Sequence, residues 1–262
     1  MPVPLTEKEK SLPYVKYFWQ DLAPIPQEKL DIWRGPMADP ALATPVERRN
    51  EFLEEGKVAL EVGFTVAPNG TGFVANRTFF PGGTPEMFYW WFGWHCVGPD
   101  LRYKLWDKED HYQARAVEAD YVRDTKVPWS EKTWGVTHDI IEDIGLGAER
   151  LLLGFCKPSD LGYDMSKVGT PACAAMVCAV GKSSSPALMT HKVVETEGGV
   201  WLKSHFWMGY GRNDAGELVK LVPDGQAVPE AAPRALFGHC IKEFSNLAAI
   251  LPSLYAEERD HL

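Results

Sequence analysis

A histidine and a glutamate four residues apart, His239 and Glu243, are the strongest local signal for chemistry in this sequence. They lie in residues 232–260, where leucine, isoleucine and phenylalanine recur at intervals of three and four, which predicts one long amphipathic helix. Residues four apart share one face of a helix, so the imidazole and the carboxylate could bind one metal ion. An exposed pair that shares only a hydrogen bond is the alternative. The apolar residues around the pair favour a half-buried position, where a carboxylate needs a partner such as a metal.

Two further segments place a titratable residue in an aromatic or apolar setting. The segment RYKLWDKEDH ends in His111, and the segment HDIIEDIG places Glu142 among isoleucines. Each has a structural alternative, since His111 is also typical of a hydrogen-bonded histidine and Glu142 of a charge at a strand edge. Composition and spacing do not join these two residues and the helical pair into one site.

The elements that must position these residues fall into two parts. Residues 1–58 are polar and interrupted by prolines, which predicts a small helical N-terminal domain with helices near 10–20, 26–35 and 45–56. Residues 59–262 form the second part. β-branched and aromatic runs predict strands at 58–67, 72–80, 87–97, 187–196 and 200–211. A curved antiparallel sheet packed against the long C-terminal helix, an α+β fold, accounts for this order.

The composition excludes several classes of partner. The chain has 262 residues, 45% of them hydrophobic, and a formal net charge of −9, so nucleic acid and anionic membrane surfaces would repel it. No apolar run is long enough for a membrane span, and the first residues lack the apolar core of a signal peptide. We therefore expect a cytoplasmic protein. Its five cysteines form no CxxC pair and are expected to be reduced and buried.

Motifs for other chemistries are absent. No glycine-rich phosphate loop is present, so a nucleotide cofactor is not expected. The three serines Ser183 to Ser185 lack the GxSxG pattern that presents a nucleophile, and we expect them in a loop.

Taken in order, the segments YWWFGWH, RYKLWDKEDH, HDIIEDIG, THKV, FWMG and HCIKE resemble the diacetylphloroglucinol hydrolase family, which includes phloretin hydrolase. The resemblance covers most of the chain after about residue 60. It implies a Bet v 1-like helix-grip fold, an N-terminal helical domain that supports a homodimer, and one zinc ion in a deep apolar cavity. The metal ligands of the family fall on His111, Glu142, His239 and Glu243.

The resemblance also assigns residues to the substrate. The family's tyrosine eight positions before the first ligand falls on Tyr103, and its substrate-facing histidine falls on His191. Both are expected to hold ring hydroxyls and to assist proton transfer. The family has a further tyrosine about fifteen residues after that histidine. This sequence has Phe206 there, with Tyr210 nearby as a possible substitute.

The activity that the resemblance implies is hydrolysis of the carbon–carbon bond between an acyl group and the ring of an acylated phloroglucinol. The enzyme class is that of hydrolases acting on carbon–carbon bonds in ketonic substances, and the products are a carboxylic acid and the remaining polyphenol. Whether the acyl group is acetyl or phenylpropanoyl stays open. A non-catalytic helix-grip carrier of aromatic ligands and a polyketide cyclase are the alternatives, because one fold serves many functions.

Overall fold

The computed structural model describes all residues from 1 to 262. Its centre is an eight-stranded antiparallel sheet in the order β1-β2-β8-β7-β6-β5-β4-β3. A separate pair, β9 (Tyr210–Arg212) and β10 (Leu218–Lys220), follows β8. The strands of the large sheet are β1 (Gly63–Val66), β2 (Gly72–Pro81), β3 (His111–Ala116), β4 (Thr137–Glu142), β5 (Glu149–Cys156), β6 (Ala175–Lys182), β7 (Ala187–Thr196) and β8 (Gly199–Met208). The chain is thus an α+β protein, as predicted.

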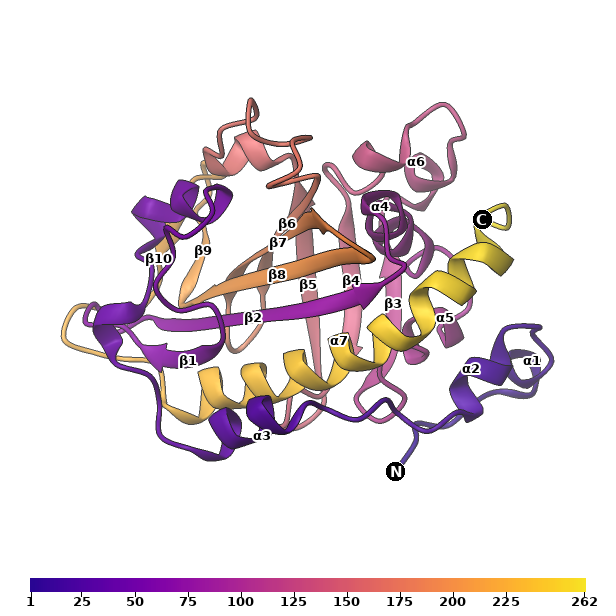
Figure 1. The fold of residues 1–262 in the computed structure, drawn as a ribbon, viewed down its shortest axis with the longest axis horizontal. Helices are drawn as coiled ribbons and strands as arrows, with labels where there is room; N and C mark the ends of the chain where they lie inside the picture. The colour runs from indigo at the N-terminus through magenta and orange to yellow at the C-terminus, as the bar shows by residue number, and fades with distance from the viewer.

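The helices surround this sheet, and the longest of them, α7, runs along it in Figure 1. The α-helices are α1 (Glu7–Lys10), α2 (Val15–Trp19), α3 (Gln27–Arg34), α4 (Pro85–Trp94), α5 (Leu101–Lys104), α6 (Ala119–Arg123) and α7 (Ala231–Glu258). The 3-10 helices are η1 (Pro40–Leu42), η2 (Val46–Leu53), η3 (Trp129–Glu131) and η4 (Pro158–Leu161). None of these helices combines the length and the apolar character that a membrane span needs.

Both faces of the sheet are covered, and strand β6 shows how the sequence achieves this. Ala175, Val177 and Ala179 join the cluster that includes α4 and α7, whereas Met176 and Cys178 join a second cluster on the opposite face. Successive side chains of a strand point to opposite faces, so a strand buried on both faces is a continuous apolar run. The face toward α7 holds the larger core and also the site described below.

The aromatic run at 87–97, which we predicted to be a strand, is mainly the helix α4. Pro85 stands in its first turn, where the fixed φ of proline suits a helix. Seven of its ten residues are buried, and the ring of Trp129 lies against Gly93, where a Cβ would come within 2.9 Å. A helix that is buried on all sides needs no polar face, so its sequence lacks the periodicity that distinguishes it from a strand.

The buried residues of segment 1–58 belong to hydrophobic clusters that they share with the rest of the chain. Tyr14 and Phe18 join the core beside α7, whereas Val46 and Leu53 join the cluster on the opposite face of the sheet. Figure 1 shows this segment extended along the molecule, with α1 and α2 near the end of α7 and α3 near its beginning. We call this segment the N-terminal strap (residues 1–58).

Candidate metal centre and cavity

Two adjacent strands and the long helix bring the predicted metal ligands together. His111 is the first residue of β3, and Glu142, the last of β4, is its direct cross-strand partner. His239 and Glu243 lie one turn apart on α7. One donor atom from each of His111, His239 and Glu243 lies within 4.8 Å of the others, so these three residues could hold a metal ion. Glu142 is not part of this group of three, although its carboxylate lies 4.0 Å from the Nε2 atom of His111.

The distances between donor atoms suit a tetrahedral ion. The two Nε2 atoms of His111 and His239 are 3.2 Å apart, and the Glu243 carboxylate lies 3.7 and 3.8 Å from them. Bonds of about 2.0–2.1 Å to zinc in a tetrahedron place ligand atoms ~3.3 Å apart. The donors therefore need to move by only a few tenths of an ångström toward a common centre.

A hydrogen bond on the far side of His111 and a close carboxylate on the far side of His239 direct both Nε2 atoms inward. The Nδ1–H group of His111 donates to the Tyr103 carbonyl oxygen at 3.2 Å. The Nδ1 atom of His239 lies 3.5 Å from a carboxylate oxygen of Asp110. With hydrogen on both Nδ1 atoms, the two Nε2 atoms face each other, and either a proton shared between them or a metal ion could join them.

Burial and neighbouring charges shift the pKa values of these groups. Burial lowers the pKa of His111 well below its ordinary value, and the charge of His239 lowers it further. Burial also lowers the pKa of His239, but the carboxylates of Glu243 and Asp110 outweigh it and raise the value to about 9. Burial raises the pKa of Glu243 well above its ordinary value despite the nearby His239. A divalent ion would favour the deprotonated form of all three ligands.

A charged network outside the ligands holds the helical histidine. Lys242 of α7 lies 3.0 Å from a carboxylate oxygen of Asp107 and 2.5 Å from one of Asp110. Both aspartates belong to the loop between α5 and β3, so the network ties this loop to the helix that carries His239. Sequence reasoning missed both aspartates, although they stand in the same WDKEDH segment that ends in His111.

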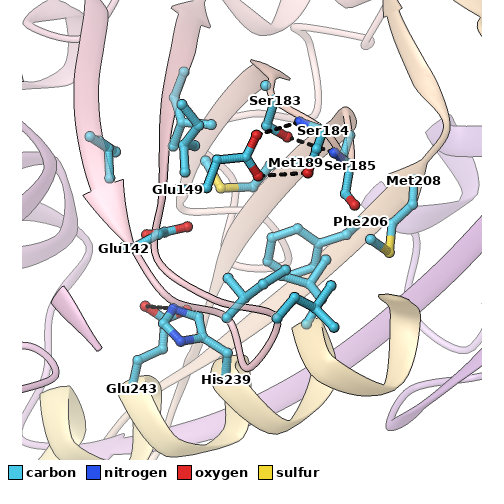
Figure 2. Close-up of a pocket in the computed structure, with 18 of the residues that line it drawn as sticks. Glu142, Glu149, Ser183, Ser184, Ser185, Met189, Phe206, Met208, His239 and Glu243 are labelled. Atoms are coloured by element: carbon cyan, nitrogen blue, oxygen red, sulfur yellow. Dashed lines mark hydrogen bonds and ion pairs between the residues drawn. The ribbon is translucent and has the colours of Figure 1, made fainter. Parts of the chain in front are cut away.

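Three of the predicted metal ligands, Glu142, His239 and Glu243, line a cavity with an apolar wall, shown in Figure 2. The wall comes mostly from neighbouring strands of the sheet: Ile140, Leu151, Leu153, Met189, Phe206 and Met208. Glu149 and the three serines Ser183 to Ser185 line the same cavity. The serines lie in the turn between β6 and β7, as predicted for a loop.

The residues predicted to contact substrate do not all lie at this cavity. Tyr103, His191 and Phe206 line it, but Tyr210 does not. Tyr210 lies in the cluster on the opposite face of the sheet, and its hydroxyl accepts a hydrogen bond from Asn69. The structure therefore does not place Tyr210 where it could replace a tyrosine at position 206.

Each of the two polar residues predicted to face substrate has a defined partner. The Tyr103 hydroxyl donates to the Glu142 carboxylate, and its ring stacks on His111 with 3.9 Å between ring centroids. The pKa of Tyr103 is raised well above its ordinary value by burial and by the Glu142 charge. The Nδ1 atom of His191 lies 2.7 Å from the Ser204 hydroxyl, and burial lowers its pKa to about 3. His191 is therefore neutral at neutral pH.

A further histidine, His95, lines the cavity. The Nδ1–H group of His95 donates to the Trp91 carbonyl oxygen at 2.8 Å, and its ring stacks on Tyr103 with 5.5 Å between centroids. His138 lies beside it, with 5.3 Å between the ring centroids, but is fully buried and does not line the cavity.

Comparison with known proteins shows the family to which this chain belongs. A family model described as the DAPG hydrolase PhiG domain matches residues 42–256. The chain belongs to this family. It is 52% identical over 259 residues to a protein named phloretin hydrolase from Eubacterium ramulus, covering 98% of this chain and 94% of that one.

Two further relatives carry the name 2,4-diacetylphloroglucinol hydrolase. One from a Pseudomonas species is 32% identical over 262 residues, which are 95% of this chain and 89% of the relative. The other, from Pseudomonas protegens, is 31% identical over 262 residues, which are 95% of this chain and 85% of the relative. All three relatives are named as hydrolases, and the family resemblance read from the sequence is confirmed.

Proposed function

We propose that this protein is a zinc-dependent hydrolase that cleaves the carbon–carbon bond between the acyl group and the ring of an acylated phloroglucinol. The observation that carries the proposal is the convergence of His111, His239, Glu142 and Glu243 at one end of an apolar cavity. The names of the relatives, at up to 52% identity, support the substrate class. Two imidazoles and two carboxylates suit zinc better than softer or harder ions. The arrangement of α7 along the antiparallel sheet supports a helix-grip architecture of the Bet v 1 type.

A zinc ion at this position would supply a Lewis acid for the acyl oxygen. The other requirement of the reaction is a leaving group, since an aryl carbanion is too unstable to depart. In a trihydroxylated ring, a keto tautomer places a proton on the carbon that bears the acyl group. Water then adds to the acyl carbon, the bond between that carbon and the ring breaks, and the ring electrons return to the enol form. The products are a carboxylic acid and the polyphenol.

The residues of this chain would control the protons of the ring. His191 is neutral, and its contact with Ser204 fixes the orientation of its imidazole in the cavity wall. A neutral imidazole can accept a proton from a ring hydroxyl and return it to a ring carbon. The Tyr103 hydroxyl, bound to Glu142, lines the same cavity as the proposed ligands Glu142, His239 and Glu243. The apolar wall excludes water from the rest of the ring.

The test is acid release from phloretin and from 2,4-diacetylphloroglucinol by purified protein, with its zinc content measured. We expect about one zinc per chain and release of a carboxylic acid from at least one ketone. Activity should be lost with a chelator and restored by zinc. Tight binding of both ketones without any acid release would instead indicate a carrier.

The tautomer step makes a separate demand on the substrate. Phloretin methylated on all three hydroxyls of its acylated ring should be inert, because it cannot form a keto tautomer with a proton on the carbon that bears the acyl group. Comparable rates of acid release from phloretin and this ether would contradict the proposed chemistry while leaving the hydrolase activity itself established.

A further inference from the structure

A second polar group lines the cavity, away from His239 and Glu243. Glu149, the first residue of β5, accepts hydrogen bonds from the backbone N–H group of Ser184 at 2.6 Å and from its hydroxyl at 2.7 Å. Figure 2 shows this pair at one end of the drawn site and His239 with Glu243 at the other. Between the two ends the wall is apolar, with Leu151 and Met189 among its residues.

The position of Glu149 in the sheet is unfavourable without a compensating role. Glu149 is the direct cross-strand partner of Glu142, and like charges opposite each other on neighbouring strands destabilise a sheet. Glu142 is accounted for by Tyr103 and by the metal site. Glu149 has only neutral donors as partners, both from Ser184.

The Glu149 carboxylate retains capacity for another donor. A carboxylate offers about four acceptor positions, and Ser184 fills two of them. Glu149 is partly buried and lines the cavity, so a further donor can reach it from within. A phenolic hydroxyl is a donor of this kind, and its hydrogen bond to a charged acceptor is stronger than a neutral one.

Resting on the function proposed above, we propose that Glu149 determines specificity by accepting a hydrogen bond from a phenolic hydroxyl at the far end of the acyl chain. The cavity is polar at both ends and apolar between them. A ketone with two hydroxylated rings joined by a short alkyl chain has the same order of polarity. A single-ring ketone with acetyl groups has no donor to offer Glu149. The geometry therefore favours an arylpropanoyl ketone such as phloretin.

A purely structural role for Glu149 makes a different prediction. If its carboxylate only anchors the turn between β6 and β7, loss of either partner in the Glu149–Ser184 contact should affect all substrates alike. Ser184→Ala removes one hydrogen bond from this contact but leaves the carboxylate in place. The two variants therefore separate the anchor from the substrate contact.

The experiment compares kcat/KM for phloretin with that for its analogue that lacks only the hydroxyl on the distal ring. For the wild type we expect a preference for phloretin of about tenfold, mostly in KM, the size typical of one hydrogen bond to a charged group. Glu149→Ala should reduce this preference below about threefold. Ser184→Ala should keep it, as should Glu195→Ala, a control at an exposed position on β7. Diacetylphloroglucinol, which has no distal ring, should be turned over equally by Glu149→Ala and the wild type.

An unchanged preference in Glu149→Ala would overturn the assignment, as would an equal loss in Ser184→Ala. A wild type that releases acid from all three ketones but shows no preference would overturn it too, with the proposed function intact. If the wild type releases acid from none of them, the proposed function fails. Calorimetric Kd values for phloretin and its analogue then test the contact by binding alone, with the same expected ratio.

Discussion

Glu243 is the ligand whose position depends most on a metal ion, because it is buried on α7 beside two other ionisable ligands. Glu243→Gln keeps the shape of the side chain but removes the charge that would balance the ion. We expect zinc content to fall well below one per chain and turnover to fall at least ~100-fold. Metal analysis by mass spectrometry and acid release measure the two effects. Glu257→Gln, at an exposed end of the same helix, is the matched control. Full zinc occupancy in Glu243→Gln would remove this residue from the ligand set.

His191 acts on the substrate rather than on the metal in our proposal, so its loss should separate the two functions. His191→Ala should keep about one zinc per chain and lose about 100- to 10,000-fold in turnover, the usual range for general acid–base assistance. Ser204→Ala, which removes only the hydrogen bond at Nδ1, should give a smaller loss. A loss of zinc from His191→Ala, or a decrease in rate below about threefold, would contradict this role.

At the scale of single elements, the loop from α5 to β3 positions His239, the proposed ligand on α7. Asp110 contacts both His239 and Lys242, so Asp110→Asn should weaken the orientation of the imidazole. Partners of this kind are typically worth about 10- to 100-fold in metal affinity. A zinc competition titration measures this loss. Glu109→Gln in the same loop, 3.6 Å from Lys242 and more exposed, should retain the affinity of the wild type. Equal affinities in the two variants would show that Asp110 does not hold the site.

Helix α3 is fixed to the sheet by a buried lysine, which makes stability depend on pH. The Lys29 ammonium donates to the Arg77 carbonyl oxygen and to the Thr78 hydroxyl, and burial lowers its pKa to about 8. An unfolded lysine has a pKa near ~10.4, so between these values the unfolded chain binds more protons. This contribution to stability is therefore smallest below pH ~8 and grows as the pH rises toward ~10.4.

The variant Lys29→Met has no proton to lose, so it should lack this increase. Between pH 7.5 and 9.5 the free energy of unfolding of the wild type should rise by about 2 kcal/mol relative to the variant. Urea unfolding at both pH values measures the difference. A difference between the two proteins that stays constant with pH would show that Lys29 titrates as an exposed lysine does.

The elements that could be predicted from the sequence are those whose apolar residues recur with the period of a helix or of a strand. The C-terminal helix and the strands around Val74, His191 and Phe206 have alternating or helical patterns, and the structure confirms them. Helix α4 was predicted as a strand because it is buried on all sides. The N-terminal strap could not be predicted because its helices pack on distant parts of the molecule, which local propensity does not encode.

The residues of the site also divide into those that could be predicted from the sequence and those that could not. His239 and Glu243 could be paired from their spacing, since one helix carries both. His111 lies 128 residues before His239, and only the family resemblance joined it to the helical pair. Glu149 was missed because its function depends on a cross-strand partner and on a turn, neither of which leaves a local pattern.

Strand β3 is the outermost strand of the large sheet and pairs only with β4. Its first residue is a proposed metal ligand, and α7, which carries two more, is far away in the sequence. A bound ion would therefore act as a cross-link between the edge strand β3 and helix α7. Such an edge strand opens locally before the rest of the fold does. Chelation should thus accelerate amide hydrogen exchange in residues 111–116 while leaving the interior strands β7 and β8 protected, so that the ion sets the cooperativity of unfolding as well as the chemistry.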